Sequence, residues 1–128
     1  MRIGVPLLGN DEVGRNTLAP GFHLCKYLGI YSLDSDKLEI LEVAKNADGI
    51  GQNSILNLLT KENITAVISP SLKIVAFILF KDSSFAVFKA EGSDLESNIE
   101  LLRNNKLSKY TMWQFGSDSM STSSNEDF

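Results

Sequence analysis

The sequence is poor in the residues that hold metals and carry out thiol chemistry, with one cysteine and one histidine among 128 residues. A single cysteine excludes an internal disulfide, which fits a reducing compartment. His23 and Cys25 stand two positions apart, where a loop rich in glycine and polar residues meets an apolar stretch. Any metal binding or thiol chemistry in this chain therefore depends on that stretch.

Basic residues are also few. The 12 Lys and Arg residues stand against 16 Asp and Glu residues, for a net charge of -4. Three of the acidic residues, Asp118, Glu126 and Asp127, lie near the C-terminus with no base beside them, so the rest of the chain is close to neutral. Nothing resembles the basic stripe of a nucleic-acid-binding protein, and we expect no nucleic-acid partner.

Long hydrophobic runs are absent. The longest, Ile74–Phe80, has seven residues, far fewer than the ~20 that span a bilayer. The first residues, MRIGVPLLG, are typical of a strand and lack the features of a signal peptide. We therefore expect a cytoplasmic protein with no membrane partner.

Length and composition predict one globular domain, because 128 residues with 43% hydrophobic content can bury a core without disulfides. Periodicity and turn residues predict five strands and three helices. The expected strands are Arg2–Leu8, Lys26–Leu33, Lys37–Val43, Thr65–Ser69 and Ser84–Lys89, and the expected helices are Ser54–Lys61, Leu72–Phe80 and Leu95–Asn104. The order β-β-β-α-β-α-β-α predicts an α/β fold with a mixed five-stranded sheet covered by helices.

The type of one element, Leu72–Phe80, is not decided by periodicity because nearly all of its residues are apolar. Its branched and aromatic residues suit a strand, but a strand here would leave only two residues to turn after Thr65–Ser69. Pro70 suits the first turn of a helix with Ser69 as its cap, so we expect a helix. Further on, the aromatic stretch Tyr110–Phe115 predicts docking on the body, and the Ser- and Asp-rich residues from Gly116 predict a flexible acidic tail.

Several short segments together resemble a known family. MRIGVP at the start matches strands such as MRIAIP, and FHLCKYLGIYSLD at Phe22–Asp34 matches a loop ending in His-Phe-Gly-Arg-Ala followed by a strand such as YFLIYDVD. DGIG at Asp48–Gly51, TAVIS at Thr65–Ser69 and the strand and helix over Ser84–Leu102 follow in the same order. The chain therefore resembles the dinitrogenase iron–molybdenum cofactor biosynthesis family, the NifX-type domain, over residues 1–107, leaving 108–128 as a tail.

The resemblance implies a ribonuclease-H-like fold that binds an iron–sulfur or iron–molybdenum cluster, or a precursor of one, without catalysis. It implies that Phe22, Gly49 and Gly51 contribute to cofactor binding. The partners it implies are cofactor-assembly or acceptor proteins, and it leaves room for a homo-oligomer.

The chain departs from the family where a ligand would sit. The family histidine that precedes Phe-Gly corresponds to Gly21, and the glycine and alanine that follow correspond to His23 and Cys25. The family segment Gly-Asn-Ile-Gly-Pro-Asn corresponds to residues 70–75, which contain no glycine. Bare backbone therefore cannot approach a ligand there as closely.

Two interpretations of His23 and Cys25 remain open. Imidazole and thiolate suit soft or borderline metals, and in an extended chain residues i and i+2 point the same way, so both could reach one ion. Two ligands leave a four-coordinate site incomplete, and a second subunit or an outside ligand would have to complete it. In the alternative interpretation, Cys25 is a small buried hydrophobe and His23 a hydrogen-bonded loop residue.

Other candidate sites are weaker. Gly49 and Gly51 before a helix could cradle an anion, but DGIG lacks the lysine of a phosphate-binding loop and equally suits a plain turn. Glu39, Glu42 and Asp48 could be taken for nuclease carboxylates, yet the first strand carries no acid. We therefore expect no enzyme, and the alternative to a cluster carrier is an interaction module that keeps the fold without its ligand.

Overall fold

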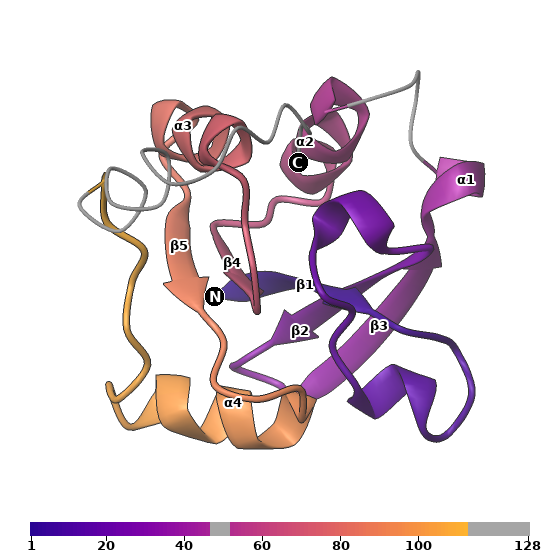
Figure 1. Cartoon of the computed structure of the whole chain (residues 1–128). Coiled ribbons are helices and arrows are strands. Elements are labelled where there is room, and N and C mark those ends of the chain that lie inside the picture. Colours follow the sequence, from indigo (N-terminus) through magenta and orange to yellow (C-terminus); the bar gives the residue numbers. More distant parts are fainter. Residues whose placement is uncertain (47–51, 113–128) are drawn as a thin grey trace.

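The computed structural model describes residues 1–46 and 52–112, which form a five-stranded sheet with helices on both faces (Figure 1). The strands are β1 (Arg2–Leu7), β2 (Tyr27–Ser32), β3 (Lys37–Glu42), β4 (Ala66–Ser69) and β5 (Ala86–Lys89). The helices are α1 (Val43–Asn46), α2 (Gln52–Lys61), α3 (Ile74–Asp82) and α4 (Leu95–Arg103), and two short 3-10 turns are η1 (Gly14–Asn16) and η2 (Phe22–Leu24). The predicted α/β class with a mixed sheet is confirmed.

The sheet has the strand order β3-β2-β1-β4-β5. The first three strands are antiparallel neighbours, and β2 and β3 form a hairpin, with Ser32 opposite Lys37. β4 and β5 run parallel to β1. β1 therefore lies at the centre of the sheet, between an antiparallel and a parallel neighbour.

Both faces of β1 are buried. Ile3, Val5 and Leu7 are fully buried in the cluster that packs against α4. On the opposite face, a Cβ atom built on Gly4 would lie 2.8 Å from Cδ2 of Leu59, so the absence of a side chain lets α2 pack directly on the strand. This explains why the first strand is a continuous apolar run and shows no alternation.

The predicted helices are all present, with differences at their ends. All three begin and end within two residues of the prediction, and α3 is shifted as a whole, to Ile74–Asp82 from the predicted Leu72–Phe80. The predicted cap was wrong: Lys73 precedes the first turn, and the hydroxyl of Ser69 donates to the carbonyl of Ser71 at 2.6 Å. The single turn α1, which follows β3 directly, was not among the predicted helices. In the described ranges, none of the helices combines the length and apolar character required to cross a membrane.

The chain after α4 returns along the outer edge of β5. The amide of Lys89 donates to the carbonyl of Ser108 at 2.8 Å, and the amide of Tyr110 donates to the carbonyl of Val87 at 3.0 Å. The Tyr110 hydroxyl donates to the carbonyl of Ser69 at 3.0 Å, and its ring joins the core under α3. These bonds cover a sheet edge that would otherwise expose unpaired backbone groups.

We expect Tyr110→Phe to lower the free energy of unfolding by about 1 kcal/mol, because it removes one of the two hydrogen bonds that the buried Ser69 carbonyl accepts, the other coming from the amide of Ala90 at 3.0 Å. Urea unfolding of the two proteins measures this difference. Tyr27→Phe is the matched control, since the Tyr27 hydroxyl makes no hydrogen bond within the described part of the chain. Equal losses in the two variants would contradict the anchoring role of Tyr110.

Candidate functional site

The loops that leave β1 and β4 meet at the carboxyl ends of these two parallel strands. The amide and the hydroxyl of Ser71 both donate to the carbonyl of Pro20, at 3.0 and 2.7 Å. From this point the chain leaves β1 towards β2, and leaves β4 through α3 towards β5, so the two connections diverge. Such a divergence between neighbouring parallel strands is where open α/β sheets bind ligands.

His23 lies in η2, on the loop that leaves β1, and its side chain is exposed. The imidazole folds back over Gly21: a Cβ atom built on Gly21 would lie 3.0 Å from both Cε1 and Nδ1 of His23. The same Cβ would lie 3.3 Å from the carbonyl oxygen of Ser71. The imidazole is therefore presented to solvent beside the junction of the two loops.

Cys25 lies beneath the same turn. Its thiol donates to the carbonyl of Phe22 at 3.2 Å and its side chain packs against the core cluster. Burial raises the pKa of the Cys25 thiol to about 12, so it is a neutral thiol at neutral pH. The side chain has the environment of a structural cysteine, not of a thiolate ligand.

The backbone of this stretch differs from the extended chain on which the paired-ligand interpretation depends. Residues 22–24 form a 3-10 turn and β2 begins at Tyr27, so His23 and Cys25 do not share one face of a strand. Phe22 is 2% exposed and contacts the ring of Phe80 edge to face, with centroids 5.6 Å apart. Phe22 thus supports the turn from the core side.

The remaining predicted residues add no donors that the structure places beside His23. Gly49, Gly51 and Asp48 lie outside the described residues. Glu39 is exposed on β3, and Glu42 pairs with Lys45 at 3.2 Å. Within residues 1–46 and 52–112, no group of three or more His, Cys, Asp or Glu side chains could hold a metal ion. The described donors therefore do not fit a resident metal centre closed by the protein itself.

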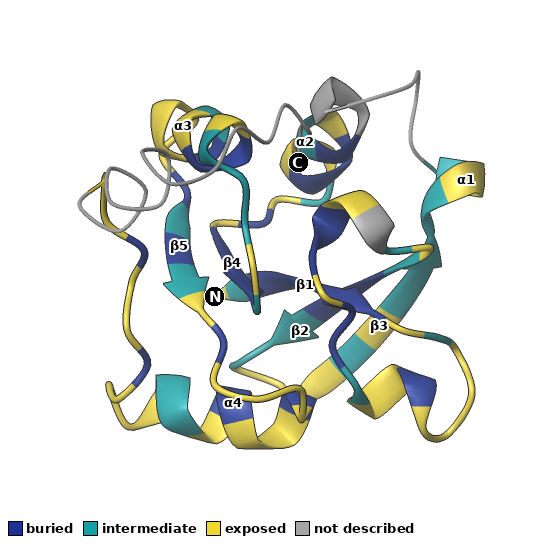
Figure 2. Cartoon of the chain, viewed as in Figure 1, coloured by how far each residue is buried: buried dark blue, intermediate teal, exposed yellow. Residues whose placement is uncertain are grey.

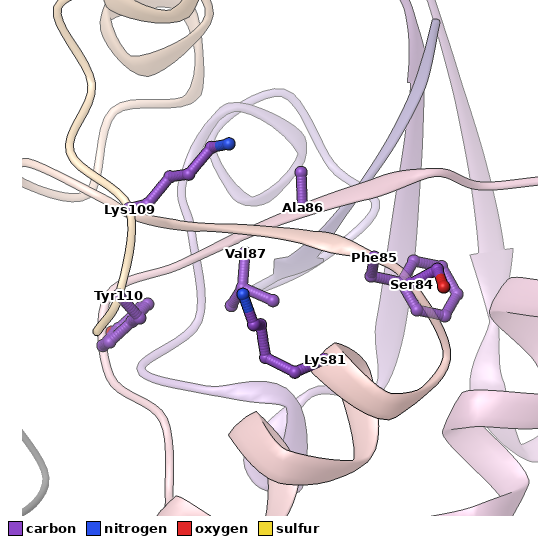
Figure 3. A pocket seen from close by; sticks show the side chains of 7 residues that line it. All are labelled: Lys81, Ser84, Phe85, Ala86, Val87, Lys109 and Tyr110. Carbon is purple, nitrogen blue, oxygen red and sulfur yellow. The ribbon is translucent and has the colours of Figure 1, made fainter. Parts of the chain in front are cut away.

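A separate cavity of about 280 Å³ lies at the outer edge of β5, two strands away from β1 (Figure 3). Its charged lining residues are Lys81 at the end of α3 and Lys109 on the C-terminal segment, and Tyr110 closes one end. Sequence reasoning missed this cavity because these residues become neighbours only through the pairing of residues 108–110 with β5.

Two curated proteins of Methanocaldococcus jannaschii are similar to the chain in sequence. The uncharacterised protein MJ0327 is 30% identical over 92 residues, which is 72% of this chain and 83% of that protein. The uncharacterised protein MJ0580 is 24% identical over 115 residues, 86% of this chain and 92% of the relative. No family model matches the chain.

Solved structures share the fold. The apo orange protein of Desulfovibrio gigas aligns with a TM-score of 0.70 at 14% identity, covering 86% of this chain and 92% of the other. A Thermotoga protein provisionally named as a NifB protein aligns with a TM-score of 0.66 at 22% identity, over 86% and 96%. The crystal structure of MJ0327, provisionally named a dinitrogenase, aligns with a TM-score of 0.62 at 21% identity, over 87% and 95%. These likenesses establish the arrangement of strands and helices.

The state of Cys25 is open to a direct test. With its pKa raised from 9.0 to about 12, the thiolate population of Cys25 at pH 8 is about a thousandfold below that of a free thiol. We expect iodoacetamide to alkylate the folded protein far more slowly than the urea-unfolded protein, with a rate that keeps rising to about pH 12. Mass spectrometry measures the rate, and a plateau near pH 9 in the folded protein would contradict the buried, protonated thiol.

Proposed function

Because the chain belongs to the NifX-like dinitrogenase cofactor family, together with MJ0327, we propose that it binds an iron–sulfur or iron–molybdenum cluster, or a precursor, as cargo. In this role the chain carries the cluster between cofactor-assembly and acceptor proteins and catalyses no reaction on it. The proposal is carried by one observation, the position of the His23 imidazole over Gly21.

The resemblance places the family histidine at position 21, where this chain has glycine. The imidazole of His23 occupies the space into which a side chain at position 21 would begin to extend, as the 3.0 Å separation from the built Cβ atom indicates. The same loop therefore still presents an imidazole, and the residue that supplies it is two positions later in the sequence. We infer that His23 serves in place of the family histidine.

The donor set favours transient carriage over permanent binding. A four-coordinate metal is normally held in proteins by three or four side chains, whereas here one candidate donor, His23, is exposed and the other, Cys25, is a half-buried neutral thiol. A cluster with its own sulfides and outside ligands needs only one protein donor to be held weakly. A weakly held cluster can pass to an acceptor protein that supplies stronger thiolate ligands.

The same residues argue against nucleophilic catalysis. A cysteine nucleophile must be a thiolate with a base nearby, but burial raises the pKa of Cys25 to about 12 and its hydrogen bond goes to a backbone carbonyl. Cys25 then acts as a small, largely apolar side chain that packs against the core cluster.

We expect anaerobically loaded protein to show charge-transfer absorption, and His23→Ala to weaken loading at least about 10-fold, the lower end of what even an outer partner of a ligand contributes. Cys25→Ala is the matched control and should load like the parent, because the thiol is protonated and packs against the core cluster. Absorption during titration with an iron–sulfur precursor measures both. Equal loading of the parent and His23→Ala would contradict the role of His23, and no absorption in the parent would favour the ligand-free interaction module.

A rescue variant tests the spatial substitution itself. The backbone of Gly21 is extended, with φ of -173°, a conformation that any residue adopts. Removing the His23 ring frees the space above it, so the double variant Gly21→His, His23→Ala should regain most of the loading. Failure of the double variant, with the fold intact by circular dichroism, would show that the loop position of the imidazole is not what matters.

A further inference from the structure

The sheet is only partly covered at its β3 edge. No residue of β3 is buried, whereas β1 is buried from Ile3 onward (Figure 2). Tyr31 of β2 and Leu38 of β3 are paired across the hairpin and pack against the core cluster on the α4 side, where both are half-buried. A cavity of about 350 Å³ lies beside this pair, and Leu95, the first residue of α4, completes its apolar lining. We call it the hairpin cavity.

Hydrogen bonds hold the walls of the hairpin cavity in place. On one side, Thr17 of the loop that leaves β1 forms a bridge with Asp94, the residue before α4. On the other side, Arg103 in the last turn of α4 donates to the carbonyl of Leu33 at 3.2 Å and to the carboxylate of Asp36 at 3.0 Å. α4 is therefore tied to both walls, and a ligand that enters the cavity has little backbone to order.

Two charges of opposite sign line the hairpin cavity without partners. Arg15 lies in η1 and Glu96 lies in the first turn of α4, and both side chains are exposed. Within residues 1–46 and 52–112, neither side chain makes an ion pair or a hydrogen bond. The third charged lining residue, Asp36, is already paired with Arg103. The cavity thus offers one free cation and one free anion.

Backbone pairing brings these two residues close together. The bridge between Thr17 and Asp94 is antiparallel. Arg15 precedes one bridge residue by two positions and Glu96 follows the other by two, so the two positions are in register across the bridge. Both side chains line the same cavity. A ligand that contacts both charges must therefore carry its own two charges close together.

Free charges of both signs argue against a simple ion as the ligand. An anion bound by Arg15 would also meet the carboxylate of Glu96, and a cation bound by Glu96 would meet the guanidinium, and both encounters are unfavourable. An α-amino acid satisfies both residues, because its carboxylate and its ammonium group are attached to one carbon atom. The planar fork of a guanidinium matches a carboxylate. A volume of about 350 Å³ is at the lower end of ligand cavities, which suits a molecule of this size.

We propose that the hairpin cavity binds a free α-amino acid with an apolar side chain. Arg15 holds the carboxylate, Glu96 holds the ammonium group, and the apolar side chain lies against Tyr31 and Leu38. The site is separate from that of the cluster, because η2 packs into the core cluster on the opposite face of the sheet. Loss of cluster loading would therefore leave this proposal standing, and the reverse also holds.

Nuclear magnetic resonance titration of the full-length, ¹⁵N-labelled protein with L-phenylalanine tests the proposal. We expect saturable shifts of the amide resonances of Arg15, Tyr31 and Glu96. The analogue 3-phenylpropionate lacks the ammonium group and phenethylamine lacks the carboxylate. Each should bind about 10-fold more weakly than L-phenylalanine, because each loses a hydrogen bond to a charged group.

Matched variants assign each charge to its residue. Arg15→Gln should weaken L-phenylalanine about 10-fold and bind phenethylamine at least as well as the parent. Glu96→Gln should weaken L-phenylalanine about 10-fold and bind 3-phenylpropionate at least as well as the parent. Glu100→Gln is the control, because Glu100 is an exposed acid of α4 that does not line the hairpin cavity, and it should bind like the parent. All three substituted side chains are exposed, so circular dichroism should stay native.

The remaining outcomes would each overturn the proposal. One is the absence of saturable shifts with both L-phenylalanine and L-leucine at millimolar concentration. Another is equal binding of L-phenylalanine and the two singly charged analogues, since the cavity would then not recognise the charge pair. Equal binding of N-acetyl-L-phenylalanine amide, which carries neither charge, would assign the cavity to a peptide segment of another protein.

Discussion

The burial of β1 on both faces and both edges is the constraint on which the rest of the molecule depends. β1 pairs with β2 on one side and with β4 on the other, while α2 and α4 lie against its two faces. The backbone N–H and C=O groups of such a strand must pair with neighbouring strands because water does not reach them. The chain can therefore change direction only at the ends of β1. The loop that leaves β1 must therefore pass over the carboxyl ends of the central strands, where it contacts the loop that leaves β4.

This placement gives two neighbouring residues opposite chemical roles. The 3-10 turn at residues 22–24 buries Phe22 against Phe80 and places Cys25 above the core, which leaves His23 on the outside. Desolvation keeps the thiol protonated, whereas the imidazole stays in contact with solvent. One exposed soft donor at the divergence of two parallel strands suits a cargo that arrives with ligands of its own and leaves again.

The fold was largely predictable because its strands and helices carry local signals. The helix α4 follows Asp94, whose carboxylate accepts from the amide of Ser97 at 2.8 Å, and an aspartate before an apolar pattern of helical period is a typical start signal. The apolar run of α3 was harder, because helices and strands buried on one side look alike when every residue is apolar. Asn98, fully buried and bonded to the backbone of Glu91, carried no sequence signal, since its partners are set by the turn before α4.

The candidate site was predictable in position but not in geometry. A lone histidine and a lone cysteine drew attention to residues 22–25, yet their spacing is compatible with an extended chain or with a turn. Only the packing of Phe22 into the core decides that the two side chains separate. The contact of His23 with Gly21 likewise depends on backbone angles that the spacing of the residues does not determine.

The most direct test of this account is pulsed electron paramagnetic resonance of the loaded, reduced protein, prepared without a histidine tag. Because the chain contains a single histidine, nitrogen coupling of the strength of a directly bound imidazole can come only from His23. The account predicts one such coupling in the parent and in Cys25→Ala. A loaded paramagnetic cluster without imidazole coupling would contradict the claim that His23 holds the cargo.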